Sequence, residues 1–329
     1  MMRRRSLCTG LALAPLSPLA SLAVSSAWAQ DYPNRPIHMV VGFTPGGGAD
    51  SVARVMEPAL SRELGQPIIV DNKPGVGGNV AAQFVERSRP DGYTIMMGTI
   101  AALAINPALY GSKLGFDPDK GLAPITNAVD SSNVLVVPVA SKFTTVRQLI
   151  EAGKTRELTY GSSGVGTAGH LAGVMFSSLT GVKMLHVPYK SGGNLISALL
   201  GGEVELAFSS GVTAVPQIEG NRLRALGVTT ERRTALLAQV PTLQEAGVAG
   251  FSSNNWHGLV APGGTPPAII ARLNAACVKV LRDPDVVAKL RAQAFDPAPM
   301  APEAFGAFMR QERVKWARFV KEAGVKAET

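Results

Sequence analysis

The chain has 329 residues, of which 46% are hydrophobic and 17% charged, and this length and composition are typical of a folded protein of about two domains. Its formal net charge is +8. Because the basic residues are dispersed and form no stripe interleaved with aromatic side chains, the sequence argues against a nucleic-acid-binding protein.

Residues 1–29 have the features of an export signal. Three arginines precede an apolar stretch that ends in the A-x-A cleavage sequence at residues 27–29. Two prolines interrupt the apolar stretch, which argues against an uncleaved membrane anchor. We therefore predict export and cleavage near Ala29. The sequence Arg4-Arg5-Ser6-Leu7 partly matches a twin-arginine signal, so the export route is left open between the twin-arginine and general secretory pathways.

Removal of this signal leaves a mildly basic chain with one cysteine. The signal holds three arginines and no acidic residue, so the formal charge falls from +8 to +5, and a modest positive field favours the approach of anions. Because Cys8 lies within the signal, Cys277 has no partner for an intramolecular disulfide. Its apolar neighbours predict a buried structural thiol.

Short β-branched runs alternate with longer helical patterns through the rest of the chain. This alternation is typical of βαβ units, and it predicts an α/β protein whose parallel sheets are covered on both faces. An apolar stripe over 302–323, followed by Gly324, predicts a C-terminal helix packed on the core. The predicted strands are residues 37–43, 68–72, 93–99, 134–138, 158–163, 184–189, 205–210 and 223–230.

The first predicted strand ends in a glycine-rich turn, GFTPGGGAD, at residues 42–50. Three glycines leave backbone N–H groups accessible at the start of a helix, and Asp50 can cap its first turn. The lysine and Ser/Thr that follow the glycines of a P-loop are missing, which disfavours a nucleotide phosphate with magnesium. The turn therefore indicates an anion site, with a simple tight turn as the alternative.

A second turn, GSSGVGTAGH at 161–170, contains the spacing G-x-G-x-x-G at Gly164, Gly166 and Gly169. A dinucleotide site needs an acidic residue about 20 positions later, and Lys190 stands there instead. Neither serine of this turn fits the nucleophile pattern G-x-S-x-G. His170, one helical turn further on, is left open between contact with a bound anion and packing against the sheet.

The sequence contains no pattern for catalysis or for a metal. Its four histidines lack metal-ligand spacing, and no C-x-x-C occurs. A third strand-to-helix turn, YKSGGN, spans 189–194 and is also rich in hydrogen-bond donors. Several donor-rich turns without a nucleophile, a general base or a metal set favour an anion-binding protein that is not an enzyme and uses no cofactor.

Eight segments, in order and spanning nearly the whole mature chain, are similar to the Bug family, the periplasmic solute-binding proteins of tripartite tricarboxylate transporters. The similarity runs from about residue 31 to the closing WARFVKEAGVK. The segments are YPNRPIHMVVGFTPGGGAD, GQPIIVDNKPGVGGNVAA, PDGYTIMMGT, LTYGSSGVGTAGHLAG, HVPYKSGGNLISALLGGEVELAF, RLRALGVTTERR, VPTLQEAGV and WHGLVAPGGTP.

The resemblance implies a two-lobed α/β fold of the periplasmic-binding-protein type II class, with a ligand cleft between the lobes. One lobe would comprise residues 30–129 plus 250–329, and the other residues 130–249. The lobes would close by hinge motion on a small organic carboxylate, and the closed, monomeric protein would deliver it from the periplasm to the permease subunits of a tripartite transporter.

In the family, two turns act as opposed pincers on the ligand, largely through backbone N–H groups and bridging waters. The positions that correspond in the first lobe are Phe43, Thr44, Gly46, Gly47 and Asp50, with Thr99 lining the same cleft. Those in the second lobe are Ser162, Ser163, Gly164, Gly166, Thr167 and His170, with Tyr189 also lining the cleft.

Two positions depart from the family pattern, which usually has an aromatic residue at His257 and an alanine at Val76. His257 and the Asn254-Asn255 pair would change the chemistry of the cleft. The ligand is therefore left open among dicarboxylates, tricarboxylates, aromatic acids, amino acids and neutral amides.

Two other functions use the same residues. An exported NAD(P)-dependent oxidoreductase would bind the pyrophosphate at the G-x-G-x-x-G turn and a 2′-phosphate at Lys190. A ligand sensor would use the same cleft but present its closed form to a signalling receptor rather than to a permease.

Overall fold

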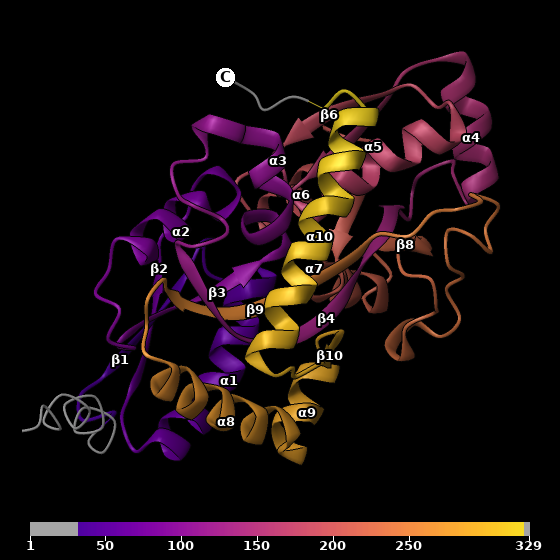
Figure 1. Ribbon diagram of the computed structural model, residues 1–329. Helices are drawn as coiled ribbons and strands as arrows, with labels where there is room; N and C mark the ends of the chain where they lie inside the picture. Colours follow the sequence, from indigo (N-terminus) through magenta and orange to yellow (C-terminus); the bar gives the residue numbers. More distant parts are fainter. Residues whose placement is uncertain (1–31, 326–329) are drawn as a thin grey trace, which may run out of the picture. The chain divides into compact units, whose positions relative to one another are not determined.

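The computed structural model describes residues 32–325, and the predicted signal peptide lies outside this range. Strands and helices alternate along the chain (Figure 1). The strands are β1 (Ile37–Val41), β2 (Ile68–Asn72), β3 (Thr94–Thr99), β4 (Leu122–Pro138), β5 (Leu158–Ser162), β6 (Met184–Pro188), β7 (Leu206–Ser210), β8 (Leu223–Val228), β9 (Asn254–Pro262) and β10 (Phe295–Pro297).

The helices include the C-terminal one predicted from the apolar stripe. They are α1 (Gly48–Leu64), α2 (Asn79–Glu86), α3 (Asn106–Tyr110), α4 (Val146–Thr155), α5 (Ala168–Thr180), α6 (Gly192–Leu200), α7 (Gly211–Glu219), α8 (Pro267–Arg282), α9 (Pro284–Arg291) and α10 (Pro302–Glu322). A short π-helical segment, η2 (Ala101–Ile105), follows β3. Among the residues described, no helix combines the length and the apolar character needed to cross a membrane.

The strands form one sheet in the order β2-β1-β3-β9-β4-β7-β5-β6, with β8 and β10 also paired to β4. Strand β1 is parallel to β2 and β3, and β5 is parallel to β6 and β7. The α/β class predicted from the alternating pattern is therefore confirmed. The expected parallel pairing is found in these two parts of the sheet, whereas the strands between them are antiparallel: β9 to both β3 and β4, and β4 to β7 and β8.

Strand β4 is much longer than the predicted run of residues 134–138. Its first part contains Asn127, Asp130 and Ser131, which break the hydrophobic pattern on which the prediction rested. In the structure these positions pair with β9 and β10, and Asn127 Nδ2 donates a hydrogen bond to the Asp130 carboxylate at 2.9 Å. Long-range strand pairing has thus overridden the local sequence signal.

The second part of β4 shows why the sheet has a helical layer on each face. Leu135 and Val137 lie in one buried cluster with residues of α4 and α5, whereas Val134 and Val136 lie in another with residues of α6 and α7. Alternate side chains of a strand point to opposite faces, so one apolar run serves both layers.

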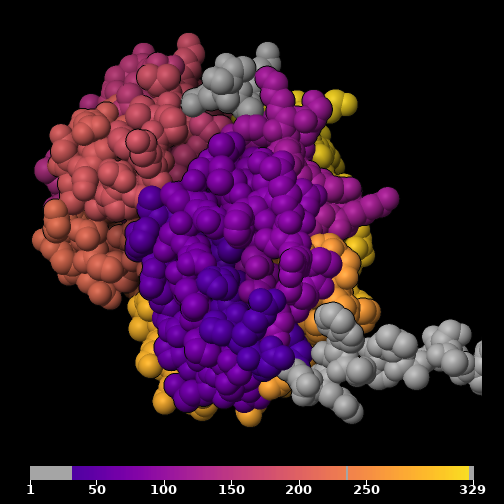
Figure 2. Space-filling model, turned by 90° about the vertical axis from the view of Figure 1, so that its left-hand side faces the viewer, coloured from indigo at the N-terminus to yellow at the C-terminus, as the bar shows by residue number. Residues whose placement is uncertain are grey.

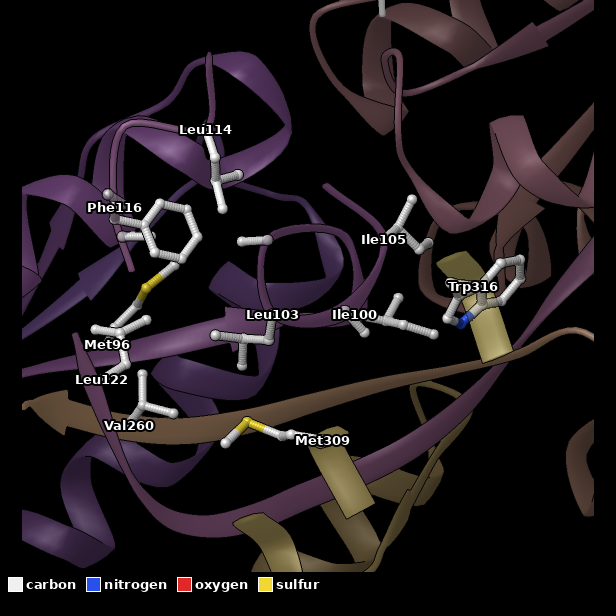
Figure 3. Close-up of a cluster of buried hydrophobic side chains, with 14 of the residues drawn as sticks. Met96, Ile100, Leu103, Ile105, Leu114, Phe116, Leu122, Val260, Met309 and Trp316 are labelled. Atoms are coloured by element: carbon white, nitrogen blue, oxygen red, sulfur yellow. The ribbon is translucent and has the colours of Figure 1, made fainter. Parts of the chain in front are cut away.

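A third buried cluster lies under α10, which crosses β4 (Figure 1). Figure 3 shows Leu103 from η2, Val260 from β9 and Met309 from α10 within it. Glu312 of α10 is also buried, and its Oε2 accepts hydrogen bonds from the indole N–H groups of Trp256 and Trp316. The single cysteine among the described residues, Cys277, is buried as predicted, and burial raises the pKa of its thiol to about 12.

The predicted boundaries between the lobes fall within β4 and shortly before β9. In the space-filling view the indigo and purple surface of the early chain adjoins the pink to orange surface of the middle of the chain (Figure 2). The division into two lobes stays a prediction.

Candidate functional site

The first glycine-rich turn joins β1 to α1 and is held from behind by Asp50. The Asp50 carboxylate accepts hydrogen bonds from Gly46 N–H at 2.9 Å, from Arg54 Nε at 3.0 Å and from Asn72 Nδ2 at 2.9 Å. Burial alone raises the pKa of this carboxyl, but these hydrogen bonds outweigh it and hold the pKa below its ordinary value. The Asp50 carboxylate therefore makes its hydrogen bonds to groups of the protein itself, and these bonds fix the shape of the turn.

The second glycine-rich turn joins β5 to α5 and is closed by its own side chains. Thr167 Oγ1 donates to the Gly164 carbonyl at 2.7 Å and also caps α5 by accepting from His170 N–H. Ser162 Oγ accepts from Gly164 N–H at 3.2 Å, and Gly166 N–H donates to Nδ1 of His170 at 3.2 Å. These bonds fix the turn, and Thr167, Ala168 and Gly169 at the start of α5 line a pocket.

His170, which is buried, and His186, which is half-buried, form a pair behind this turn. Their rings stack with centroids 4.1 Å apart, and His186 Nε2 is 2.7 Å from the hydroxyl oxygen of Ser162. Burial lowers the pKa of His170 to about 4, and burial together with the neighbouring His170 lowers that of His186 to about 3. Both imidazoles are therefore neutral near pH 7.

The two turns face a common pocket that encloses about 70 Å³ of space. This is several times the roughly 10 to 15 Å³ that a cavity needs to admit one water molecule, so the pocket has room for a small molecule. The residues predicted from the sequence that line it are Phe43, Thr44, Gly47, Thr99, Ser163 and Thr167. The predicted residues that lie outside its lining are Gly46, Asp50, Ser162, Gly164, Gly166, His170 and Tyr189. Tyr189 instead donates its hydroxyl proton to Glu203 at 3.2 Å.

Several polar residues that line the pocket were not selected from the sequence. Ser191 and Gly192 belong to the third donor-rich turn, so a signal for them was available. A fourth turn, between β7 and α7, has the same strand-to-helix pattern. Asn133 has no local signal because it lies in the middle of β4. The polar lining residues that were not selected are Asn133, Ser191, Ser209, Ser210 and Thr213. Asn255 and His257, which were expected from the sequence to change the chemistry of the cleft, also line the pocket.

Four helices of the described range, α1, α5, α6 and α7, begin at this pocket. Thr167 and Ser191 cap α5 and α6 with side-chain hydrogen bonds, whereas the first turns of α1 and α7 have no side-chain cap. A helix N-terminus presents free N–H groups and a partial positive charge. No Lys, Arg, Asp or Glu occurs among the lining residues that the structure describes, so backbone dipoles dominate the field in the pocket.

Four polar side-chain atoms at this pocket are buried and have no hydrogen-bond partner among residues 32–325. They are Thr99 Oγ1, Asn133 Nδ2, Ser210 Oγ and His257 Nδ1. Burial lowers the pKa of His257 to about 4, so its imidazole is neutral near pH 7. In proteins the great majority of buried polar groups have a hydrogen-bond partner. Several buried groups without one in a single pocket therefore indicate a place for a polar ligand.

The G-x-G-x-x-G pattern has a structural explanation that does not involve a dinucleotide. Gly166 has a φ of +76°, and a Cβ atom there would collide with the side-chain oxygen of Asn106. A Cβ atom at Gly169 would collide with the carbonyl oxygen of Phe208 on β7. The glycines allow a left-handed turn and a close approach of α5 to the sheet.

Comparison with known proteins identifies relatives over nearly the whole chain. Residues 52–325 match the family model described as the tripartite tricarboxylate transporter family receptor, TctC. Protein BugT of Bordetella pertussis (strain Tohama I) is 33% identical over 301 residues, which cover 91% of this chain and 92% of BugT.

Solved structures of similar proteins have the same fold. Rpa4515 of R. palustris, determined with adipate, is 34% identical with a TM-score of 0.87 over 90% of this chain and 99% of the other. The periplasmic binding protein BugD is 32% identical with a TM-score of 0.85 over 90% and 100%. MatC from Rhodopseudomonas palustris, with bound malate, is 30% identical with a TM-score of 0.83 over 88% and 100%.

Proposed function

Because this chain belongs to the tripartite tricarboxylate transporter receptor family, we propose that it captures a small organic carboxylate in the periplasm and delivers it to the permease subunits of a tripartite transporter. The observation that carries this proposal is the pocket itself. Four helix N-termini and several hydroxyl groups converge on it, with no charged side chain among its described lining residues.

The physical chemistry of the pocket supports a carboxylate ligand. Backbone N–H groups and hydroxyl groups bind a carboxylate by charge-assisted hydrogen bonds, each contributing roughly 1.5 to 3 kcal/mol. The positive ends of the helices replace a countercharge. Two relatives, Rpa4515 with adipate and MatC with malate, have small dicarboxylates in their structures.

Hinge closure follows from the way the donors are divided between segments. Thr44 and Gly47 belong to the predicted lobe of residues 30–129 plus 250–329, whereas Ser163 and Thr167 belong to the predicted lobe of residues 130–249. A ligand that contacts both sets favours the closed form, because only that form offers all the donors. The permease would then distinguish the loaded protein by its shape.

The predicted site residues divide into two roles in this proposal. Those that line the pocket, such as Thr44 and Ser163, contact the ligand or its waters. Those behind the turns, such as Asp50 and His170, hold the turns in shape through the hydrogen bonds described above.

A thermal-shift screen against small carboxylates, with neutral amides, sugars and NADP alongside, tests the ligand class. We expect a carboxylate to raise the melting temperature and to lose much of this effect in Ser163→Ala. The matched control is Ser178→Ala, because Ser178 is exposed on the outer part of α5. A shift with NADP, or only with amides or sugars, would contradict the proposal.

Pull-down from membranes tests the second half of the proposal. The ligand-loaded protein should retain permease subunits, and the ligand-free protein should retain much less. Recovery of a signalling receptor instead would show that the pocket serves sensing rather than transport.

A further inference from the structure

A segment of unusual backbone lies beside the second glycine-rich turn. Four consecutive residues, 75–78, have positive φ angles, and one of them is the β-branched Val76 at +48°. A positive φ strains a β-branched residue, and such strain persists only where the surrounding structure holds it. The segment belongs to the first predicted lobe. Together with Asn106 of α3, we term it the cradle.

Asn106 holds this backbone within the first predicted lobe. Its side chain is fully buried, and Nδ2 donates a hydrogen bond to Asn79 Oδ1 at 2.7 Å. The same Nδ2 donates to the carbonyl oxygens of Val76 and Gly77 at 3.3 and 3.4 Å. All three partners lie in the first predicted lobe, so the amide N–H groups of Asn106 fix the strained segment.

The oxygen side of the Asn106 amide faces the second predicted lobe. A Cβ atom at Gly166 would collide with Asn106 Oδ1. A Cβ atom at Gly77 would lie 3.0 Å from Asn106 Nδ2 and 3.2 Å from the carbonyl oxygen of Val165. The cradle and the turn are therefore in close contact at two glycines, one in each predicted lobe. Neither glycine belongs to β4 or β9, the strands that link the two parallel parts of the sheet.

Apolar side chains extend this contact. Ala168 and Leu171 of α5 are buried in one cluster with Ile105 of η2 and Leu109 of α3, and Val165 packs against it. Figure 3 shows Ile105 within this cluster. Burial of apolar surface between segments of the two predicted lobes favours the form in which the lobes are together.

One atom of the cradle indicates that the contact opens. Asn106 Oδ1 is buried and has no hydrogen-bond partner among the described residues. The N–H of Gly166 is not free for it, because that group donates to His170 Nδ1. Buried polar atoms are normally paired, and this oxygen would bind water once the turn moves away. Its lack of a partner opposes closure and keeps the contact reversible.

We propose that Asn106 is a positioning residue that holds the second glycine-rich turn against the cradle and so acts as a latch for the closed form. This inference rests on the hinge closure of the proposed function. Gly77, Asn106 and Gly166 do not line the pocket, so the latch acts on the balance between open and closed forms. A fall in the population of the closed form lowers the apparent affinity for every ligand by the same factor.

Gly166→Ala and Gly77→Ala test the latch from its two sides, because each new methyl group would push the turn and the cradle apart. The measurement is isothermal titration with malate, succinate, adipate and citrate. In both variants, every one of these acids that binds the wild type should lose affinity by the same factor, about tenfold or more.

A double variant tests whether Asn106 is the partner of the turn. Asn106→Ala alone should weaken binding, since it releases the cradle. It also removes the atom with which a methyl group at position 166 would collide. In the double variant of Gly166→Ala and Asn106→Ala, the loss of binding free energy should therefore be smaller than the sum of the two single losses.

Gly181→Ala and Gly65→Ala are the matched controls. Each of these glycines has a φ of +70°, and a Cβ atom there would meet nothing within 4 Å. Gly181 ends α5, the helix that follows Gly166, and Gly65 ends α1 in the first predicted lobe. The controls introduce the same backbone strain without a collision, so their affinities should stay within about twofold of wild type. Thermal unfolding establishes that each variant is folded.

The outcomes separate the latch from the proposed function. An equal loss of affinity in the controls, a factor that differs between ligands, or additive losses in the double variant would overturn the latch and leave the proposed function standing. If none of the four acids binds the wild type, the proposed function fails. The latch then stands only if small-angle X-ray scattering gives both latch variants a larger radius of gyration than the wild type and the controls.

Discussion

The α-carbon of Gly48 lies against the imidazole of His257, so that a Cβ atom at Gly48 would stand only 3.2 Å from His257 Nε2. This contact joins the first glycine-rich turn to β9. Gly48 is needed because its lack of a side chain leaves room for the His257 imidazole, and because a side chain at this position would enter the pocket.

Replacing Gly48 with alanine should therefore weaken ligand binding far more than folding. The new methyl group would crowd His257 and Ser210. Alanine within a helix is favoured over glycine by about 0.5 to 1 kcal/mol, which offsets part of the crowding. We expect an affinity loss of about tenfold or more by calorimetry, with a change of less than about 1 kcal/mol in the free energy of unfolding.

Gly193→Ala is the comparison for this variant. Gly193 is exposed in the first turn of α6 and does not line the pocket, and a Cβ atom there would have only Ser191 Oγ nearby, at 3.8 Å. Its affinity should stay within about threefold of wild type. An equal loss in both variants would mean that the contact with His257 is not the cause.

Gly169→Ala should destabilise the fold. The added Cβ atom would collide with the backbone carbonyl of Phe208, which a side-chain rotation cannot relieve. We expect a loss of about 2 kcal/mol or more in urea unfolding. In Gly193→Ala the new methyl group would have only Ser191 Oγ nearby, at 3.8 Å, and this variant should be neutral or slightly more stable. A stable Gly169→Ala protein would refute the packing role given to the third glycine of the pattern.

Asp50→Asn should lower stability and, indirectly, ligand affinity. The asparagine amide cannot accept all three hydrogen bonds that the carboxylate accepts from Gly46, Arg54 and Asn72. The expected loss in unfolding free energy is about 1 to 3 kcal/mol at pH 7. The exposed Asp285→Asn serves as the control and should stay within about 0.5 kcal/mol of wild type.

The effect at Asp50 should depend on pH in a defined direction. Its pKa in the folded state lies below the ordinary value of 3.8, so the stability it contributes is present above that value. This contribution is lost as the pH falls through the folded pKa. The difference between wild type and Asp50→Asn should therefore narrow in acid, and a difference that widens would contradict the assignment.

His170→Asn should flatten the pH dependence of stability between pH 6.5 and about 4. In this pH window His170 is protonated in the unfolded chain but stays neutral in the folded protein. The free energy of unfolding of the wild type therefore falls as the pH falls. The effect of this one histidine is on the order of 1 to 3 kcal/mol. Asparagine can still accept from Gly166 N–H but does not titrate. Urea unfolding at several pH values measures the slope, and an unchanged slope would show that His170 is not responsible.

The sequence predicted the strands of the two parallel parts of the sheet well, and it predicted the long antiparallel strands β4 and β9 poorly. The strands at 37–43, 158–163 and 205–210 were correctly expected because each is a short run with apolar residues that leads into a turn before a helix. The strand at Asn254–Pro262 was not, since its beginning is polar and its stability comes from pairing with β3 and β4. A local pattern carries no information on a partner strand that is remote in the chain.

The candidate site divides in the same way. Both glycine-rich turns were recognised from the sequence, because glycines and hydroxyl residues between a strand and a helix have a local meaning. Asp50 and His170 were selected with them, and the structure places both behind the turns rather than in the pocket lining. Proximity in sequence did not reveal which side of the turn each side chain faces.

By itself, the sequence determined the α/β class, the glycine-rich turns and the family, since each of these depends on short segments and their order. Only the tertiary structure brought Thr99 beside His257 and Asn133 beside Ser210, and only it set the starts of four helices around one pocket. The reason is physical. Sheet register and helix packing bring these residues together from segments far apart in the chain, and the sequence around each residue does not indicate which distant segment it will meet.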